Sequence, residues 1–370
     1  MPGCVVADHI HHGYTGTAGV VEVCDAVGKA RAQMEQGHSR SVRHAGVSVG
    51  CSRADTFEEA EHRPDGRISV KNADKRYLCG AGVGKTDVAI EIASHFKCEI
   101  ISADSRQFFR EMRIGTAVPT LQQLETIKHH FIRFLSVKDY YSSSLFERDV
   151  LEFLPKLFLS GNITLMTGGS GLYIDAVCYG IDEIPDVDSS VREKYLAKYS
   201  AEGIEGLRET LKILDPEHYK VVDLNNYKRI IRALEICETA GKPYSSFLKK
   251  QKKERDFGII KIGLDRPRDV LYKRINSRVD EMVRLGLEDE AKRLYDFRNL
   301  NALNSVGYKE FFDVFDGKIS RERAIELIKR NSRRYAKRQL TWWGKDKEIK
   351  WFKPENVGDI IEYIETLVVV

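Results

Sequence analysis

The sequence contains no long apolar run. No window approaches the roughly 20 consecutive apolar residues that a helix needs to cross a bilayer, so we do not expect a membrane protein. The seven cysteines are odd in number and include no C-x-x-C pair, which argues against a zinc site and against a framework of disulfide bonds. We interpret them as free thiols in a reducing compartment and predict a cytoplasmic protein.

Residues 1–75 contain few aromatic side chains and no persistent helical or strand periodicity. Tyr14 and Phe57 are their only aromatic residues, whereas six of the ten histidines of the chain fall here. The segment lacks the apolar core of a secretory signal and is too acidic for a typical transit peptide. We predict that it is disordered or a spurious extension, produced by a sequence shift upstream of Gly82.

The composition is typical of a soluble enzyme. A chain of 370 residues is longer than one typical domain, and 42% of its residues are hydrophobic and 31% charged. The net charge of +4 is too small to indicate a nucleic-acid partner by itself. Basic residues cluster at 249–253 and 329–338, where they suit contact with phosphate groups, although a solvated helix face explains either stretch equally well.

Strand and helix signals alternate in the rest of the chain. Helical periodicity at 85–96 precedes a short apolar strand at 99–103. A helix at 145–159 precedes a second strand at 163–167, which runs into Gly168–Gly171. This alternation predicts a parallel sheet with helices on its faces, and a ligand site at the carboxyl ends of the strands.

A phosphate-binding loop lies directly before the first of these helices. It matches the Walker A pattern G-x-x-x-x-G-K-[ST] except at the first glycine, and consists of Cys79, Gly80, Ala81, Gly82, Val83, Gly84, Lys85 and Thr86. Backbone N–H groups and the Lys85 ammonium suit a diphosphate or triphosphate, and the Thr86 hydroxyl suits Mg²⁺. A G-K-T tripeptide that arises by chance is less common directly before a segment with helical periodicity, so this position favours a true phosphate-binding loop.

The strand signals stop between residues 182 and 255. Further elements are predicted as helices at 191–199, 204–214 and 225–239, a strand at 258–264, and helices at 268–296 and 321–343. We therefore predict an α/β fold with a P-loop NTPase-like parallel sheet core and an inserted helical domain. The core comprises residues 76–181 and 256–370, and the insert comprises residues 182–255.

Asp104 and two arginines are candidates for the chemistry beside the P-loop. Asp104 ends the first strand, where a carboxylate binds Mg²⁺, acts as a general base or simply caps a turn. Arg268 and Arg274 lie six residues apart on one predicted helix. Arginines at this spacing suit a pyrophosphate, with surface salt bridges as the alternative.

Ordered strings of residues resemble the signature of the tRNA dimethylallyltransferases, also called tRNA isopentenyltransferases. The resemblance runs from Gly82 to about Trp351, which is nearly all of the regular part of the chain. Its strings are Ile101–Gln107 with Ile114–Ala117, Lys128–Ile132, Gly168–Tyr173, Arg229–Glu235, Arg278–Met282, Gly307–Glu310 and Arg334–Gln339.

The resemblance implies an enzyme that transfers a dimethylallyl group from dimethylallyl diphosphate to N6 of the adenosine on the 3′ side of the anticodon. Its substrates would be tRNAs that read codons beginning with U. The tRNA anticodon loop and dimethylallyl diphosphate are then its partners, and Mg²⁺ its cofactor. Asp104 matches the base that takes the amine proton. Lys85, Thr86, Arg268 and Arg274 match groups that stabilise the departing pyrophosphate.

The resemblance also implies a set of tRNA contacts from two regions of the chain. These residues are Asp104, Ser105, Arg106, Gln107, Ser170, Arg192, Lys228, Arg229, Ile230, Ile231 and Arg232. The periodicity supports this set only in part, because Ile230 and Ile231 fit the core face of a helix. Gln107 suits the reading of a base edge or, equally, a structural turn.

The chain departs from the family at several positions. Cys79–Ala81 replace Gly-Pro-Thr, and residues 71–78 replace a strongly apolar strand, so we expect the loss of an inner element of the sheet. Ser170 replaces a threonine and keeps the hydroxyl, whereas Asn226 replaces an aspartate. The zinc finger of eukaryotic relatives is absent, which favours a bacterial-type enzyme, and we expect a monomer.

Three other functions stay open. An adenylate isopentenyltransferase uses the same donor and P-loop with a free nucleotide as acceptor. A small-molecule kinase of the P-loop class transfers a phosphoryl group from ATP. A chain that is catalytically impaired by the altered P-loop would bind tRNA without transferring anything.

Overall fold

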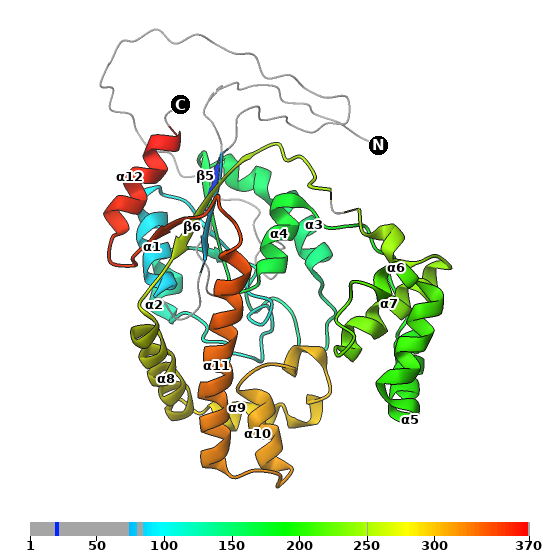
Figure 1. Cartoon of the computed structure of the whole chain (residues 1–370). Coiled ribbons are helices and arrows are strands. Elements are labelled where there is room, and N and C mark those ends of the chain that lie inside the picture. Colours follow the sequence, from blue (N-terminus) through cyan, green and yellow to red (C-terminus); the bar gives the residue numbers. More distant parts are fainter. Residues whose placement is uncertain (1–18, 22–73, 80–83, 250, 369–370) are drawn as a thin grey trace, which may run out of the picture. The chain divides into compact units, whose positions relative to one another are not determined.

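A parallel sheet of seven strands forms the centre of the described chain (Figure 1). The computed structural model describes residues 19–21, 74–79, 84–249 and 251–368. The strands lie in the order β4-β3-β5-β2-β1-β6-β7, and β2 also pairs directly with β6. Every pairing is parallel. They are β1 (Gly19–Val21), β2 (Asp74–Cys79), β3 (Ile100–Ser102), β4 (His129–His130), β5 (Ile163–Thr167), β6 (Gly258–Leu264) and β7 (Lys350–Phe352). The predicted α/β class with a parallel sheet is confirmed.

The strand that precedes the P-loop is present, so the expected loss of an inner strand is wrong. In β2, Tyr77 pairs with Met166 of β5 on one side and with Lys261 of β6 on the other. Every residue other than proline offers one backbone donor and one acceptor. The largely polar sequence at 74–79 therefore still supplies the ladder of hydrogen bonds that an inner strand requires.

Part of the N-terminal segment also joins the sheet. Gly19–Val21 form β1, whose first residue pairs with Asp74 of β2 and with Gly258 of β6. This strand corrects the prediction that the whole of residues 1–75 lacks structure. Apart from residues 19–21, 74 and 75, that segment lies outside the described residues.

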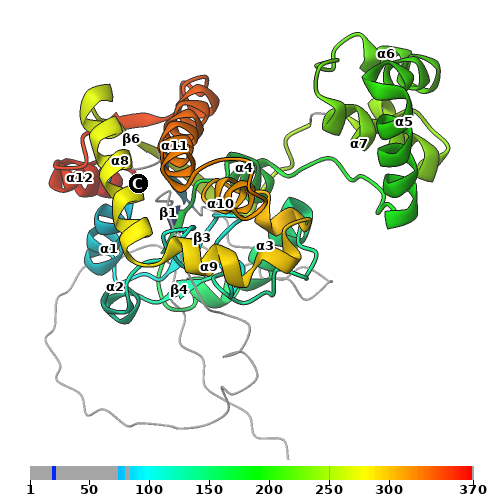
Figure 2. The same ribbon diagram turned by 90° about the horizontal axis from the view of Figure 1, so that it is seen from below.

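Helices on one face of the sheet share a single apolar core with it. Ile100, Leu165 and Ile262, from three different strands, are fully buried in this core. The helices that pack there are α1 (Lys85–His95), α8 (Arg268–Arg284), α11 (Arg321–Trp343) and α12 (Val357–Val368). Figure 2 shows α1, α8 and α12 together on this side.

The opposite face is covered by α3 (Ser143–Phe158) and α4 (Gly171–Tyr179), as Figure 1 shows. An aromatic cluster packs beneath them, with the ring of Phe108 5.5 Å from Phe146 and 5.6 Å from Tyr173. The remaining helices of this unit are α2 (Leu121–Thr126), α9 (Leu287–Arg293), η2 (Tyr295–Phe297), η3 (Asn301–Leu303) and α10 (Tyr308–Phe315). No helix among the described residues is long and apolar enough to cross a bilayer.

Residues 179–254 form a second compact unit without strands in its described part. Its helices are α5 (Ser189–Leu214), α6 (Pro216–Tyr219), α7 (Tyr227–Ala240) and η1 (Tyr244–Phe247). Gly203 interrupts α5 with φ 69° and ψ −163°, which separates the two helices predicted at 191–199 and 204–214. Leu207, Leu211 and Ile230 pack between α5 and α7 in a core of their own.

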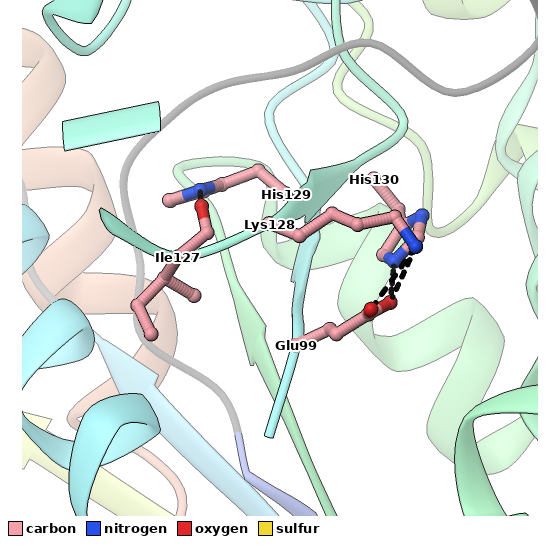
Figure 3. A network of polar contacts seen from close by, with 5 residues as sticks. All are labelled: Glu99, Ile127, Lys128, His129 and His130. Carbon is pink, nitrogen blue, oxygen red and sulfur yellow. Dashed lines mark hydrogen bonds and ion pairs between the residues drawn. The ribbon is translucent and has the colours of Figure 1, made fainter. Parts of the chain in front are cut away.

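Buried histidines occupy the edge strand β4 (Figure 3). His130 Nε2 lies 2.5 Å from Glu99 Oε2, and Lys128 Nζ donates to the same carboxylate at 3.0 Å. The hydrogen bond to His130 holds the pKa of Glu99 below its usual value. His129 Nδ1 donates to the Ile127 carbonyl at 2.7 Å, while its Nε2 has no hydrogen-bond partner in the structure. Burial lowers the pKa of His129 to about 4.

We expect the protein to lose stability as the pH falls from 7 to 5. The pKa of His129 is about 4 when folded and about 6.5 when unfolded, so the unfolded chain binds more protons in this range. The difference corresponds to about 2 kcal/mol at pH 5. His129→Asn keeps a donor for Ile127 but does not titrate. Urea unfolding at pH 7 and pH 5 measures the free energy of unfolding. Its fall between the two pH values should be about 2 kcal/mol smaller in this variant than in wild type, and equal falls would contradict the prediction.

Candidate active site

Three strands end side by side at the carboxyl edge of the sheet. Strands β3, β5 and β2 are neighbours in the sheet, and their last residues are Ser102, Thr167 and Cys79. Asp104, the glycine loop Gly168–Gly171 and the P-loop follow these residues in the sequence. Because the carboxyl ends of parallel strands lie at the same edge, the sheet assembles segments that are distant in the chain.

The described part of the P-loop begins helix α1. Gly84 has φ 100° and ψ 26°, a left-handed conformation that residues with a Cβ rarely adopt. Lys85 is buried, and Thr86 lies in the first turn of the helix, where the helix dipole favours an anion. The predicted binding residues Gly80–Val83 lie outside the described residues, and of Cys79 only its place in β2 is described.

Two guanidinium groups lie beside Gly84. The position that a Cβ of Gly84 would take is 3.4 Å from Arg274 Nη2 and 3.7 Å from Arg266 Nη2. Arg274 is among the predicted residues, and Arg266 is not. Arg266 also forms an ion pair with Glu355. Its place just after the carboxyl end of β6, at the same edge as the P-loop, is the signal that would have found it.

Arg268 and Arg274 were predicted to suit the same pyrophosphate, but the two residues lie in different environments. Arg268 is exposed in the first turn of α8, and its Nε donates to the Tyr272 hydroxyl at 3.0 Å. The guanidinium also lies over the Tyr272 ring, 5.2 Å from the centroid. A spacing of six residues on a helix does not ensure that two side chains point to one site.

Asp104 is a nearly buried carboxylate at the end of β3. Its exposed fraction is 9%, and its Oδ1 accepts the Arg106 backbone N–H at 3.0 Å. The neighbouring Ser105 N–H donates to Ser170 Oγ at 3.0 Å, which ties this turn to the glycine loop. A partly accessible carboxylate held by its own turn is suited to accept a proton from a bound substrate.

A cavity of about 530 Å³ opens beside Asp104. Its apolar lining residues include Ile275, Val279, Met282, Ile328 and Trp343. Its polar lining residues include Asp104, Ser105, Arg106, Ser170, Arg278, Tyr335, Arg338 and Gln339. Burial raises the pKa of another lining residue, Tyr173, to about 12, so its hydroxyl stays protonated at neutral pH. The cavity therefore offers an apolar wall beside a polar one.

The predicted tRNA contacts near Asp104 divide into lining and buried residues. Ser105, Arg106 and Ser170 line the cavity. Arg106 Nη1 donates to the Asn301 carbonyl at 2.8 Å, which fixes its guanidinium. Gln107 is buried, with Nε2 bonded to the Thr116 carbonyl, and it is not among the lining residues. Gln107 thus holds one wall of the cavity in place.

The other predicted tRNA contacts lie in the second unit. Lys228 and Arg229 are exposed at the start of α7, and Arg232 is partly exposed one turn later. Arg192 and Arg232 both pair with the buried carboxylate of Glu235, at 3.4 and 3.5 Å. Ile230 and Ile231, by contrast, have buried side chains in the core between α5 and α7.

Glu290 is a buried residue near the cavity that the sequence does not single out. Its carboxylate accepts the backbone N–H groups of Arg113 and Ile114 and of Gly115, each at 2.9 to 3.0 Å. The Tyr308 hydroxyl donates to it at 2.7 Å. Gly115 lines the cavity and is close enough to Tyr308 that a Cβ would lie 2.5 Å from the ring. Glu290 thus fixes the position of the cavity wall at Gly115.

The hydroxyl of Thr86 suits a magnesium ion. Among the described residues no three His, Cys, Asp or Glu side chains come close enough to hold a metal ion by themselves. Mg²⁺ needs few protein ligands, because waters and substrate phosphates complete its octahedron. The Thr86 hydroxyl, in the first turn of α1, is a ligand of this kind.

A P-loop sequence, a carboxylate and a cavity beside it, at the carboxyl edge of a parallel sheet, define a P-loop-type α/β enzyme. The family model described as IPP transferase matches residues 107–346. The sequence is 52% identical over 284 residues to tRNA dimethylallyltransferase 1 of Bacteroides fragilis, covering 77% of this chain and 94% of the relative. It is 53% identical over 285 residues to tRNA dimethylallyltransferase of Christiangramia forsetii, covering 77% of this chain and 94% of the relative.

Solved structures agree with these relatives. The full-length tRNA isopentenylpyrophosphate transferase of Bacillus halodurans has a TM-score of 0.57 at 36% identity, covering 79% of this chain and 95% of that one. A eukaryotic dimethylallyltransferase acting on tRNA has a TM-score of 0.61 at 27% identity, covering 75% and 72%. The chain belongs to the IPP transferase family, and the predicted family is confirmed.

Removing the Glu290 carboxylate should strongly destabilise the larger unit. Glu290→Ala leaves three backbone N–H groups and a tyrosine hydroxyl without their acceptor, which we expect to cost about 3 kcal/mol or more. Glu326→Ala is the control, because this exposed carboxylate pairs with Arg323 on the surface of α11, and its removal should cost less than about 0.5 kcal/mol. Urea unfolding measures both, and equal losses would rule out the proposed role.

Proposed function

We infer that this chain is a tRNA dimethylallyltransferase, which transfers a dimethylallyl group from dimethylallyl diphosphate to N6 of the adenosine next to the anticodon in tRNA. The observation that supports it best is the placement of Asp104 and the P-loop helix at one sheet edge, beside a cavity with an apolar wall. Relatives named for this activity are more than 50% identical over three quarters of the chain.

The reaction requires one bond to form and one to break. The N6 amine attacks C1 of the allyl group, and the C1–O bond to the diphosphate breaks with its electron pair leaving on pyrophosphate. An exocyclic adenine amine is a weak nucleophile, so a base must take its proton as the C–N bond forms. Asp104 is the carboxylate that lines the cavity, and we assign it as this base.

The cations beside Gly84 suit the departing pyrophosphate. Arg266 and Arg274 lie next to the helix N-terminus that begins at Lys85, and fixed charges at the site of developing negative charge lower the barrier. Thr86 would hold Mg²⁺, which when bound neutralises further phosphate charge. The apolar residues Ile275 and Val279 continue the site along α8 and suit a five-carbon allyl group.

The polar wall suits the nucleotide. Ser105, Arg106 and Ser170 line the cavity beside Asp104, where an adenine that has left its stack would enter. Lys228 and Arg229 give the second unit exposed positive charge that suits the phosphates of a tRNA stem. A cytoplasmic location and a monomeric state are parts of the same proposal, which rest on the cysteine pattern and the family resemblance.

The acceptor distinguishes this function from adenylate isopentenylation. We expect radiolabel from dimethylallyl diphosphate to enter unmodified tRNA at a rate at least 100-fold above that for AMP. The assay runs purified full-length protein with Mg²⁺ and each acceptor at equal concentration. Label in AMP alone would indicate the free-nucleotide enzyme, and label in neither would indicate a chain that only binds tRNA.

Replacing Asp104 should abolish transfer without abolishing tRNA binding. Asp104→Asn keeps the shape of the side chain but cannot take a proton, so we expect kcat to fall by about 10²–10⁴-fold. Affinity for tRNA, measured by filter binding, should change by less than about threefold, because most of that affinity comes from phosphate contacts elsewhere. Asp149→Asn, on helix α3, is the matched control, because Asp149 is not among the residues that line the cavity. Unchanged turnover in the Asp104 variant would remove it as the base.

A further inference from the structure

Helix α11 holds the glycine loop through a single carbonyl. The Gly169 carbonyl accepts a hydrogen bond from the Tyr335 hydroxyl at 2.9 Å and a second from Gln339 Nε2 at 2.7 Å. Tyr335 and Gln339 lie one turn apart on α11 and both line the cavity. Gln339 is 5% exposed, so its bond to the loop is shielded from water.

The glycine loop in turn holds the end of β3. A Cβ at Gly168 would lie 2.1 Å from the Ala103 backbone, so the two backbones are in direct contact. Ser170 N donates to the Ala103 carbonyl at 3.2 Å. The position of a Cβ at Gly169 is 2.9 Å from Asp104 Oδ2 and 2.8 Å from Gln339 Nε2. Gly169 therefore separates the Gln339 amide from the Asp104 carboxylate with no side chain of its own.

The amide of Gln339 lowers the stability of the fold. Its Oε1 is buried and has no hydrogen-bond partner in the structure, whereas Nε2 is committed to Gly169. A buried polar atom without a partner destabilises a fold, and methionine of similar volume would avoid that penalty. Side chains that leave a buried polar atom without a partner in this way are expected at functional positions.

We propose that Gln339 and Tyr335 are positioning residues, which set the orientation of the Asp104 carboxylate through the Gly169 carbonyl. The proposal rests on the proposed function, in which Asp104 is the base. A base must lie within hydrogen-bond reach of the proton it takes, so a small displacement of the loop lowers the rate of transfer. Neither residue takes the proton itself.

The test compares three variants of the full-length protein with wild type. Gln339→Met removes the donor at nearly constant volume, Tyr335→Phe removes the other donor, and Gln339→Glu places a negative charge near Asp104. Thr341→Val is the control, because Thr341 is exposed on the same helix and its hydroxyl donates to the Lys337 carbonyl. The measurements are kcat and KM for tRNA and for dimethylallyl diphosphate, the pH profile of kcat, and Tm.

We expect Gln339→Met to lower kcat at least about tenfold, with both KM values within about twofold of wild type and Tm unchanged or higher. Tyr335→Phe should act in the same direction. Gln339→Glu should move the acid limb of the kcat profile upward by on the order of one pH unit, because a nearby like charge raises the pKa of the base. The other charged or titratable residues that line the cavity with Asp104 and Tyr335 are Arg106, Tyr173, Arg278 and Arg338, and they are unchanged in every variant.

Several outcomes would overturn the proposal. They are unchanged kcat in Gln339→Met, a fall in kcat that follows a fall in Tm, or an unshifted acid limb in Gln339→Glu. Failure of Gln339→Met to fold would also count against it, since the amide would then be structural. These results differ from failure of the proposed function, in which Asp104→Asn itself keeps full activity.

Discussion

The parallel pairing of β3 with β5 is the constraint on which the site depends. It places Ala103 beside Thr167, with the Ala103 N–H donating to the Thr167 carbonyl at 2.6 Å. The next residue of each strand then turns at the same edge, so Asp104 and the glycine loop leave the sheet together. Gly168 is needed there because its backbone touches that of Ala103, and any side chain would push the carboxylate away.

In the proposed function, oppositely charged residues of the site serve opposite chemical tasks. At the P-loop end, Arg266 and Arg274 approach Gly84, where negative charge accumulates as pyrophosphate departs. At the other end, Asp104 faces the cavity, where an amine must lose a proton. The cavity beside Asp104 also has apolar lining residues, among them Ile275 and Val279 of α8, which suit the uncharged allyl group in that function. Leaving group, transferred group and nucleophile thus each have matching residues near the carboxyl edge of the sheet.

Local patterns predicted the elements better than the partners of individual side chains. The strand at 163–167 and the helix at 321–343 were predicted with the bounds that the structure has, because periodicity and flanking residues are local signals. The inner strand β2 was missed, since its sequence is polar and its pairing depends on backbone atoms alone. Arg266 and Glu290 were missed because neither belongs to a short motif, and the groups that they contact are distant in the sequence.

The sequence alone determined the family, the α/β class and Asp104 as a candidate base, because these follow from ordered motifs whose residues are close in the chain. Only the tertiary structure decided which side chains meet. It placed Arg266, rather than Arg268, beside Gly84. It also placed Gln339 within hydrogen-bond distance of the Gly169 carbonyl. Such contacts depend on how the sheet and helices pack, and residues so far apart in sequence carry no local signal of their approach.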